Sequence, residues 1–247
     1  MKVNNLVAQQ LENTIKLPLS HVAIIMDGNR RFAKENKIAN YEGHRLGVAN
    51  LKNIVQHAGS LGLEYLTVYA FSSENWTRSK DEVKYLFELF AQVLTEEFDE
   101  LAKKGVRLTF IGNLELLPQN LYKSMLKSMQ ETQSNTGLKL QVAINYGSRL
   151  EIANAVKNIA QAVLSGNIRI DQIDEKMVAN FLYTKNIPDP ELVIRTGGQM
   201  RLSNYLLYQS AYTEIYVTPK LWPEFTPVDF DAAMNDFSNR KRNYGGD

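Results

Sequence analysis

A chain of 247 residues can bury a sizeable core, and because no Gly-, Ser- or Pro-rich linker divides it, one domain is expected. With 28 basic and 27 acidic residues the net charge is +1, which gives no global field to attract nucleic acid, so an anion site must be local. The absence of cysteine excludes a disulfide framework, a thiol nucleophile and a Cys-ligated metal.

The N-terminal residues lack the basic and then apolar pattern of a secretory signal, and no segment reaches the roughly 18 apolar residues that span a bilayer. We therefore expect a cytoplasmic protein. Residues 1–20 are expected to form an amphipathic or flexible segment, and residues 21–247 the folded domain.

Short apolar runs alternate along the chain with longer helical patterns. The runs predict strands at 21–26, 65–71, 106–112, 138–146, 191–196 and 214–218. Helices are predicted at 45–60, 80–103, 118–134, 149–165, 172–182 and 228–240. This alternation is typical of an α/β fold with a mainly parallel sheet that is covered by helices on both faces.

Polar stretches follow three of the predicted strands directly. They are Asp27-Gly28-Asn29-Arg30-Arg31 after the first strand, Ser72-Ser73-Glu74-Asn75-Trp76-Thr77-Arg78 after the second, and Arg195-Thr196-Gly197-Gly198 with Arg201-Leu202-Ser203-Asn204 after the fifth. Ligands of parallel sheets bind beyond the carboxyl ends of the strands, so we expect the three stretches to face one cleft.

The residue types in these stretches indicate phosphate binding. Gly28 allows a close backbone approach, N–H groups at the start of a following helix would receive a phosphate, and arginine donates charge-assisted hydrogen bonds. An acid in such a site would repel the ligand unless it held a cation. Asp27 is therefore a candidate Mg²⁺ ligand, and Glu214, at the start of the last strand, is a candidate second carboxylate.

Each of these residues also has a structural interpretation. Asp27 and Asn29 could cap a helix, Arg30 and Arg31 could be solvated surface charges, and His44 could be a structural histidine. The convergence of three polar loops favours the functional interpretation.

The predicted helix at 80–103 has an apolar sector wider than the roughly 100° that a surface helix needs to cover a sheet. One part of it can face the sheet while another lines a cavity, although burial by the helix's own domain or by a second subunit explains the width equally well. Combined with the phosphate site, the cavity predicts a ligand with a diphosphate head and a hydrocarbon tail.

Five stretches carry a resemblance to a known family. HVAIIMDGNRRFA, the GH at 43–44, YAFSSENWTR, VIRTGGQMRLSNYLLYQSAYTEIY and LWPEF resemble, in order, the signature stretches of the cis-prenyltransferases, the undecaprenyl diphosphate synthase family. The resemblance covers residues 21–245, and the DDxxD motif of the all-helical trans-prenyltransferases is absent from the sequence.

The resemblance implies a single catalytic domain over 21–247, with a six-stranded sheet, a hydrophobic tunnel and a homodimeric assembly. It implies a Mg²⁺-dependent condensation of isopentenyl diphosphate with an allylic diphosphate such as farnesyl diphosphate. The product would be a cis-polyprenyl diphosphate, such as the long carrier-lipid precursor of cell-wall sugars. Peripheral membrane contact is expected for its release, and no nucleic-acid partner is expected.

Residue roles follow from the same resemblance. Asp27 would handle the metal, and Glu214 would share it, in the same chain or from the partner subunit's end of the site. The allylic diphosphate would be held by Gly28, Asn29, Arg30, Arg31 and His44, beside Phe32, and isopentenyl diphosphate by Arg195, Arg201 and Ser203, with Leu202 among them. A mobile loop of Ser72, Ser73, Glu74, Asn75, Trp76 and Arg78 would close over both substrates.

Two asparagines, Asn75 and Asn40, stand at positions that bear on the chemistry. Asn75 stands where the family is proposed to use an amide in proton removal, but a free amide is a poor base, so the departing diphosphate is the favoured acceptor. Asn40 stands four residues before His44, where many bacterial members have an arginine that would contact the allylic diphosphate.

Three functions fit the sequence. The first is a chain-elongating cis-prenyltransferase, and the second is a short-chain or branching member that performs one condensation. The third is a non-catalytic subunit that binds prenyl diphosphates, although the family residues retained at the site argue against it. Product length should depend on tunnel residues such as Ala70, Ile111 and Leu138.

Overall fold

The computed structural model describes residues 19–96 and 98–241, and these residues form one α/β fold around a six-stranded sheet. The strands are β1 (His21–Ile25), β2 (Tyr65–Ser72), β3 (Arg107–Ile111), β4 (Lys139–Tyr146), β5 (Leu192–Arg195) and β6 (Glu214–Val217). Their order is β3-β4-β2-β1-β5-β6, and every neighbouring pair is parallel. The predicted fold class and all six strands are confirmed, whereas the segment expected at 1–20 falls outside the described residues except for its last two positions.

The helices are α2 (Asn29–Glu35), α3 (Asn40–Ser60), α4 (Lys80–Glu96), α5 (Phe98–Lys103), α6 (Gln119–Thr132), α7 (Ser148–Leu164), α8 (Glu175–Phe181) and α9 (Pro227–Asn239). A short 3-10 helix, η1 (Ser73–Thr77), follows β2. The helix predicted at 80–103 is α4 followed by α5, and α2, expected only as a helix start after Gly28, was given no predicted range. Its seven residues are too few to show a helical period, and most of them are polar.

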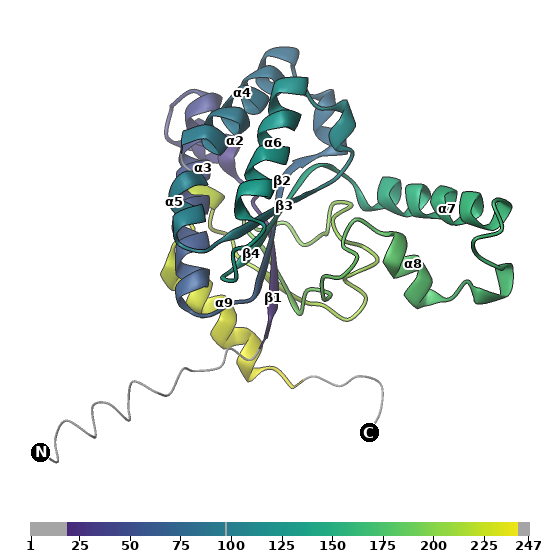
Figure 1. Cartoon of the computed structure of the whole chain (residues 1–247). Coiled ribbons are helices and arrows are strands. Elements are labelled where there is room, and N and C mark those ends of the chain that lie inside the picture. Colours follow the sequence, from purple (N-terminus) through teal and green to yellow (C-terminus); the bar gives the residue numbers. More distant parts are fainter. Residues whose placement is uncertain (1–18, 97, 242–247) are drawn as a thin grey trace, which may run out of the picture.

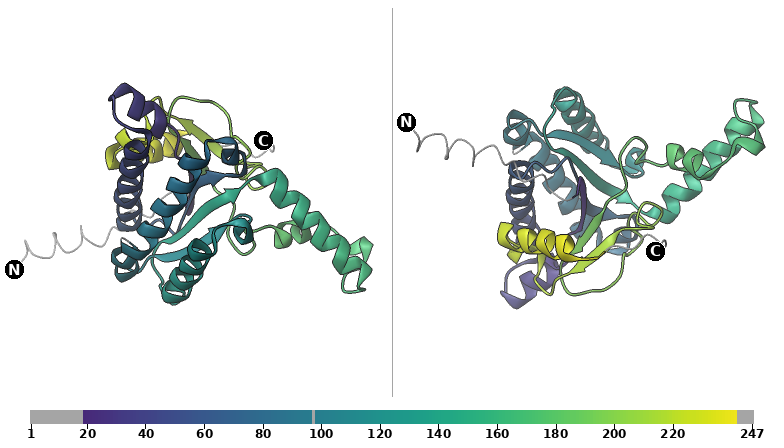
Figure 2. Two further views of the ribbon diagram at one scale, coloured as in Figure 1. Left: turned by 90° about the horizontal axis from the view of Figure 1, so that it is seen from above. Right: turned by 90° about the horizontal axis from the view of Figure 1, so that it is seen from below.

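The two faces of the sheet are covered differently. Successive side chains of a strand point to opposite faces, so Val22 and Ile24 belong to the large core beneath α3, α4, α6 and α9, whereas Ala23 and Ile25 belong to a smaller cluster. That smaller cluster includes Tyr205 of the long loop between β5 and β6. Helices α7 and α8 extend away from the body as an arm, as Figures 1 and 2 show from three sides.

The order of the strands brings the three polar stretches together. β2, β1 and β5 are consecutive neighbours in the sheet, so the loops that follow them leave the same edge side by side. From β1 the chain builds the sheet toward β3, and after β4 it returns across β1 to add β5 and β6. Such a reversal opens a crevice at the carboxyl ends, where α/β proteins bind ligands. Among the described helices, none is long and apolar enough to cross a bilayer.

Candidate active site

Asp27 is fixed at the centre of the crevice by contacts on both sides. Its Oδ2 accepts a hydrogen bond from Nη2 of Arg195 at 2.9 Å, and its Oδ1 lies 3.2 Å from Nη2 of Arg31. Its backbone carbonyl accepts from the Thr196 hydroxyl at 2.7 Å and from the Trp222 N–H at 3.0 Å. The carboxylate is therefore held in one orientation, and its side chain remains 30% exposed toward the crevice.

Gly28 connects Asp27 to helix α2. Its φ of 122° is a conformation that favours glycine, and a Cβ there would lie 2.9 Å from the backbone and side chain of Leu221. The close backbone approach predicted for Gly28 is thus present. The group that approaches it, however, is Leu221 of the same chain and not a bound phosphate.

Asn29, the first residue of α2, packs closely against α3. A Cβ at Gly47 of α3 would lie 2.5 Å from the Asn29 Oδ1, and one at Gly43 would lie 2.4 Å from the Asn29 carbonyl oxygen. The two glycines are four residues apart on one face of α3, which lets the helices approach closely. The Asn29 Oδ1 is buried without a hydrogen-bond partner, and the residue lines two neighbouring hollows, one polar and one apolar.

A small polar hollow of about 150 Å³ surrounds these groups. It is lined by Met26, Asp27, Gly28, Asn29, Arg30, Arg31, His44 and Arg78, and most of these were predicted to bind the allylic diphosphate. Burial, and then the nearby Arg78, lower the pKa of His44, so its imidazole is held neutral near pH 7. The hollow therefore presents guanidinium groups and a neutral imidazole to an anion.

A second group of anion-binding residues lies on the other side of Asp27. Arg195 is buried, and its Nη1 donates to the Ser203 hydroxyl at 2.8 Å and to the Arg201 carbonyl oxygen. Ser203 and Asn204 have φ values of 51° and 62°, so the loop that presents them turns through left-handed backbone. The side chain of Arg201 is exposed, and Leu202 is partly buried beside it. The structure thus places the predicted isopentenyl diphosphate residues together.

The stretch from Ser72 to Arg78 closes a third side of the crevice. The Trp76 Nε1 donates to Oδ1 of Asn145 at 2.8 Å, and Asn204 Nδ2 donates to Glu74 Oε1 at 2.7 Å. The Asn75 Oδ1 accepts from the Ser72 N–H at 3.1 Å. Its amide oxygen therefore caps the loop. Ser73 lies beside Gly147, where a Cβ would be 2.4 Å from the serine hydroxyl.

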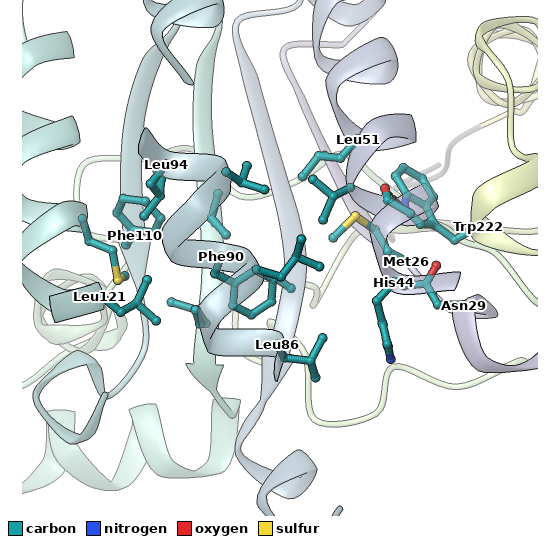
Figure 3. A pocket seen from close by; sticks show the side chains of 18 residues that line it. Met26, Asn29, His44, Leu51, Leu86, Phe90, Leu94, Phe110, Leu121 and Trp222 are labelled. Carbon is teal, nitrogen blue, oxygen red and sulfur yellow. Dashed lines mark hydrogen bonds between the residues drawn. The ribbon is translucent and has the colours of Figure 1, made fainter. Parts of the chain in front are cut away.

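An apolar cavity of about 80 Å³ adjoins the polar hollow. Asn29 and His44 lie at one side of it, and Leu94, Phe110 and Leu121 lie at the other (Figure 3). Met26, Asn29 and His44 line both spaces, so the apolar cavity and the cationic hollow lie directly against one another.

Helix α4 lines the cavity along its length through Leu86, Leu89, Phe90, Val93 and Leu94. From Leu86 to Leu94 the helix rises about 12 Å, which gives the length of the cavity lining along α4. The predicted lining role of this helix is confirmed.

The chain matches the family model described as "Putative undecaprenyl diphosphate synthase" over residues 25–245. It belongs to this family of isoprenyl transferases. Its fold and motifs are therefore those of a prenyltransferase, as the resemblance predicted.

Individual relatives and a solved structure support this family assignment. An isoprenyl transferase of Heliobacterium mobile is 48% identical over 226 residues, which are 92% of this chain and 87% of that protein. The (2E,6E)-farnesyl-diphosphate-specific ditrans,polycis-undecaprenyl-diphosphate synthase of Micrococcus luteus is 43% identical over 100% of this chain and 96% of its own. The crystal structure of lavandulyl diphosphate synthase from Lavandula x intermedia, in complex with dimethylallyl diphosphate, superposes with a TM-score of 0.91 at 36% identity, over 94% of this chain and 100% of that one.

The prenyltransferase site fits a Mg²⁺ ion held by one protein carboxylate. Mg²⁺ keeps several waters and is bound through one or two carboxylates together with substrate phosphates. Asp27 offers such a carboxylate at the mouth of the hollow. Among the described residues, no three His, Asp or Glu side chains gather as a metal cage.

Glu214 does not join Asp27 within one chain. It pairs in register with Leu192 at the amino end of β5, and its Oε2 accepts from Arg240 Nη1 at 2.7 Å. Asp27 lies beyond Ile25, which pairs with Arg195 at the carboxyl end, so at least about 10 Å of strand separates the two acids. A shared metal within one subunit is therefore a wrong prediction, and sharing across subunits stays a prediction.

Other predicted positions lie outside the site. Asn40 is exposed at the first turn of α3 and does not line the hollow, and Phe32 is partly buried on α2. Ile111 belongs to the cluster on the opposite face of the sheet, so its predicted tunnel role is wrong. Leu138 packs in the large core beyond the cavity lining, whereas Ala70 lines the cavity as expected.

Two residues of the site were not predicted. Asn145, with a φ of 48°, anchors Trp76, and Glu82 faces the cations of the hollow. The only signal for Glu82 in the sequence was its place four residues after Arg78 at the start of a predicted helix.

Proposed function

We propose that the enzyme condenses isopentenyl diphosphate with farnesyl diphosphate, in repeated cycles, to a long cis-polyprenyl diphosphate of the carrier-lipid type. The observation that carries the proposal is the position of an apolar cavity directly beside a cationic hollow, with Met26, Asn29 and His44 lining both. An allylic diphosphate has the same two halves, a hydrocarbon tail and an anionic head.

The two head groups bind on either side of Asp27. Arg30, Arg31 and Arg78, with His44, hold the allylic diphosphate in the hollow, and Arg195 with Ser203 and the exposed Arg201 holds isopentenyl diphosphate. The hydrogen bond from Arg195 to Asp27 links the two groups. Holding both reactants in fixed geometry removes much of the entropic barrier of a bimolecular step.

In each condensation the allylic C–O bond breaks, and the double bond of isopentenyl diphosphate forms the new C–C bond. A proton then leaves the attacking unit, so the products are the elongated diphosphate, free diphosphate and a proton. Preorganised guanidinium groups stabilise the charge that develops on the leaving diphosphate. Asp27 would hold Mg²⁺, which would supply further Lewis-acid stabilisation of that charge.

Two further features of the chain suit this reaction. The Asn75 Oδ1 already accepts from Ser72, which favours the departing diphosphate as the proton acceptor. The apolar lining of the cavity excludes water, which would otherwise hydrolyse a reactive allylic centre.

The long product is supported by the Micrococcus luteus relative, whose name specifies farnesyl diphosphate and undecaprenyl diphosphate. A single condensation is the second candidate, because the lavandulyl diphosphate synthase structure is so similar in fold. In both cases, the cavity must widen beyond its 80 Å³ to accept the tail.

We propose that the enzyme works as a homodimer and contacts a membrane when it releases product. The α7–α8 arm supports the dimer, since it projects from the body (Figure 2). Its exposed apolar side chains include Val156, Leu164 and Ile170. Exposed apolar side chains on one projecting element are typical of an interface between subunits.

The experiment that tests the function uses labelled isopentenyl diphosphate and Mg²⁺ with either farnesyl or dimethylallyl diphosphate, and sizes the products by chromatography. We expect a long product from farnesyl diphosphate. A single-condensation product from both starters would support the second candidate, and no product from either would contradict both.

A further inference from the structure

Glu82 lies in the first turn of α4 with its carboxylate turned toward the cationic hollow. Its Oε1 accepts from Arg78 Nη1 at 3.1 Å, lies 3.4 Å from His44 Nε2 and lies 3.9 Å from Arg30 Nε. The side chain is only 13% exposed. One carboxylate oxygen therefore faces basic groups from α2, from α3 and from the end of the loop that follows β2.

The same three basic residues line the hollow in which the allylic diphosphate is proposed to bind. When the hollow holds no substrate, Arg30 and Arg78 face one another with like charges. Burial and the neighbouring Arg30 lower the pKa of Arg78, whereas Glu82 raises it. Glu82 thus supplies the negative charge that stabilises the group before a substrate arrives.

We propose that Glu82 is an internal counter-anion, which binds the cations of the empty hollow and is displaced from them by the allylic diphosphate. The inference rests on the proposed function, because it takes this hollow as the allylic head-group site. Carboxylates and phosphates bind guanidinium groups through the same N–H donors, so the two anions compete. Such competition lowers the apparent affinity for the substrate and keeps the site formed without it.

The displacement of Glu82 by a diphosphate would also affect the loop from Ser72 to Arg78. Arg78 ends the stretch that begins at Ser72, and its contact with Glu82 is a pairing of residues four apart across the start of α4. When a diphosphate replaces Glu82 as the partner of Arg78, the end of the loop gains a contact with the ligand. Occupation of the hollow is thereby linked to the position of the loop.

The test measures binding of farnesyl thiolodiphosphate, an unreactive allylic analogue, by calorimetry without isopentenyl diphosphate. We expect Glu82→Gln to lower the dissociation constant by about three- to tenfold, because the amide no longer competes as an anion. The unligated variant should melt at a lower temperature than the wild type, and the analogue should raise its melting temperature by more. Glu82→Ala should tighten binding in the same direction.

Asp81→Asn is the matched control. Asp81 is exposed in the same helical turn and carries the same charge, but it does not line the hollow. We expect the dissociation constant of this variant to stay within about twofold of the wild type, since exposed charges are screened. In turnover, Glu82→Gln should lower the KM for farnesyl diphosphate and leave the KM for isopentenyl diphosphate unchanged.

The outcomes distinguish a failure of the Glu82 inference from a failure of the proposed function. Weaker analogue binding by Glu82→Gln would show that Glu82 supports the bound head group, and equal tightening in Asp81→Asn would show a general charge effect; either overturns the inference alone. If the wild type neither binds the analogue nor condenses the substrates, the proposed function fails and the inference fails with it.

Discussion

The guanidinium of Arg195 donates a hydrogen bond to the carboxylate of Asp27 at 2.9 Å, between the carboxyl ends of the neighbouring strands β1 and β5. Arg195 is only 5% exposed in its side chain, so this contact balances a buried charge as well as orienting the acid. Loss of the carboxylate thus removes a proposed metal ligand and also leaves Arg195 without its anionic partner.

We therefore predict that Asp27→Asn lowers turnover by at least about a hundredfold, because the amide keeps the shape but not the charge of the proposed metal ligand. Turnover measured against Mg²⁺ concentration checks this. Asp27→Ala should in addition reduce the melting temperature, since it leaves a buried guanidinium unpaired. Near-wild-type turnover of Asp27→Asn, or equal wild-type activity in EDTA, would contradict the proposed role of Asp27.

The cavity predicts how product length responds to its lining. Ala70 lies on β2 against the space, so Ala70→Leu should shorten the product. Leu94→Ala at the far end of α4 should lengthen it by at least one five-carbon unit, with a loss of about 2 to 5 kcal/mol in stability. Chromatography of the products measures both. Ile111→Val on the opposite face is the control, and a shift in its products equal to that of Leu94→Ala would place the tunnel elsewhere.

The hydrogen bond from Trp76 to Asn145 predicts a loop-positioning role for the asparagine. Asn145 is buried with a φ of 48°, which asparagine and glycine tolerate, so Asn145→Gly removes the acceptor without straining the backbone. We expect a higher KM for both substrates and stronger acrylamide quenching of Trp76, the more exposed of the two tryptophans.

Trp76→Phe provides the matching variant for that bond. Phenylalanine preserves most of the ring packing against Phe71 and Phe87 but has no N–H to donate. If the bond is what matters, the double variant should have nearly the same KM values as either single variant. Additive effects would mean that Asn145 acts through its other contact, the donation from its Nδ2 to the Asn113 carbonyl at 2.7 Å.

Elements with strong local patterns were predictable from the sequence. The continuous apolar run of β1 is typical of a strand buried on both faces, and all five of its residues are buried. The rule that ligands bind at the carboxyl ends of parallel strands then located three loops that the structure brings together. Helix α2 was not predictable in the same way, because a seven-residue polar segment has no period to detect.

Contacts between distant segments set the limit of that prediction. Glu82 pairs locally with Arg78, but its approach to Arg30 and His44 depends on how α2 and α3 pack against α4. The placement of Glu214 could have been excluded within one chain, because a residue that starts a parallel strand lies at the edge opposite to the ligand site. The resemblance to the family, which implies that Glu214 shares the metal, led to the opposite expectation.

The last prediction concerns His21, at the start of β1, whose pKa is lowered to about 4, chiefly by burial. Its Nδ1 lies 2.7 Å from the Pro188 carbonyl oxygen, which can only accept, so Nδ1 carries the proton. Its Nε2 lies 2.7 Å from the Thr67 Oγ1, and the Thr67 hydroxyl donates to Gln141 Oε1 at 3.2 Å. Burial therefore favours the neutral ring in the native protein, whereas the unfolded chain protonates the ring near pH 6.5.

Because the unfolded state binds the proton first, the contribution of His21 to stability is fully present above pH 6.5 and is lost as the pH falls toward 4. We expect the free energy of unfolding of the wild type, relative to His21→Gln, to fall by about 2 to 3 kcal/mol between pH 7 and pH 4.5. Urea unfolding of both proteins at several pH values measures this difference, and the comparison cancels the buried Glu151, whose raised pKa acts in the opposite direction. A difference that stays constant or grows as the pH falls would show that His21 is not held neutral in the native protein.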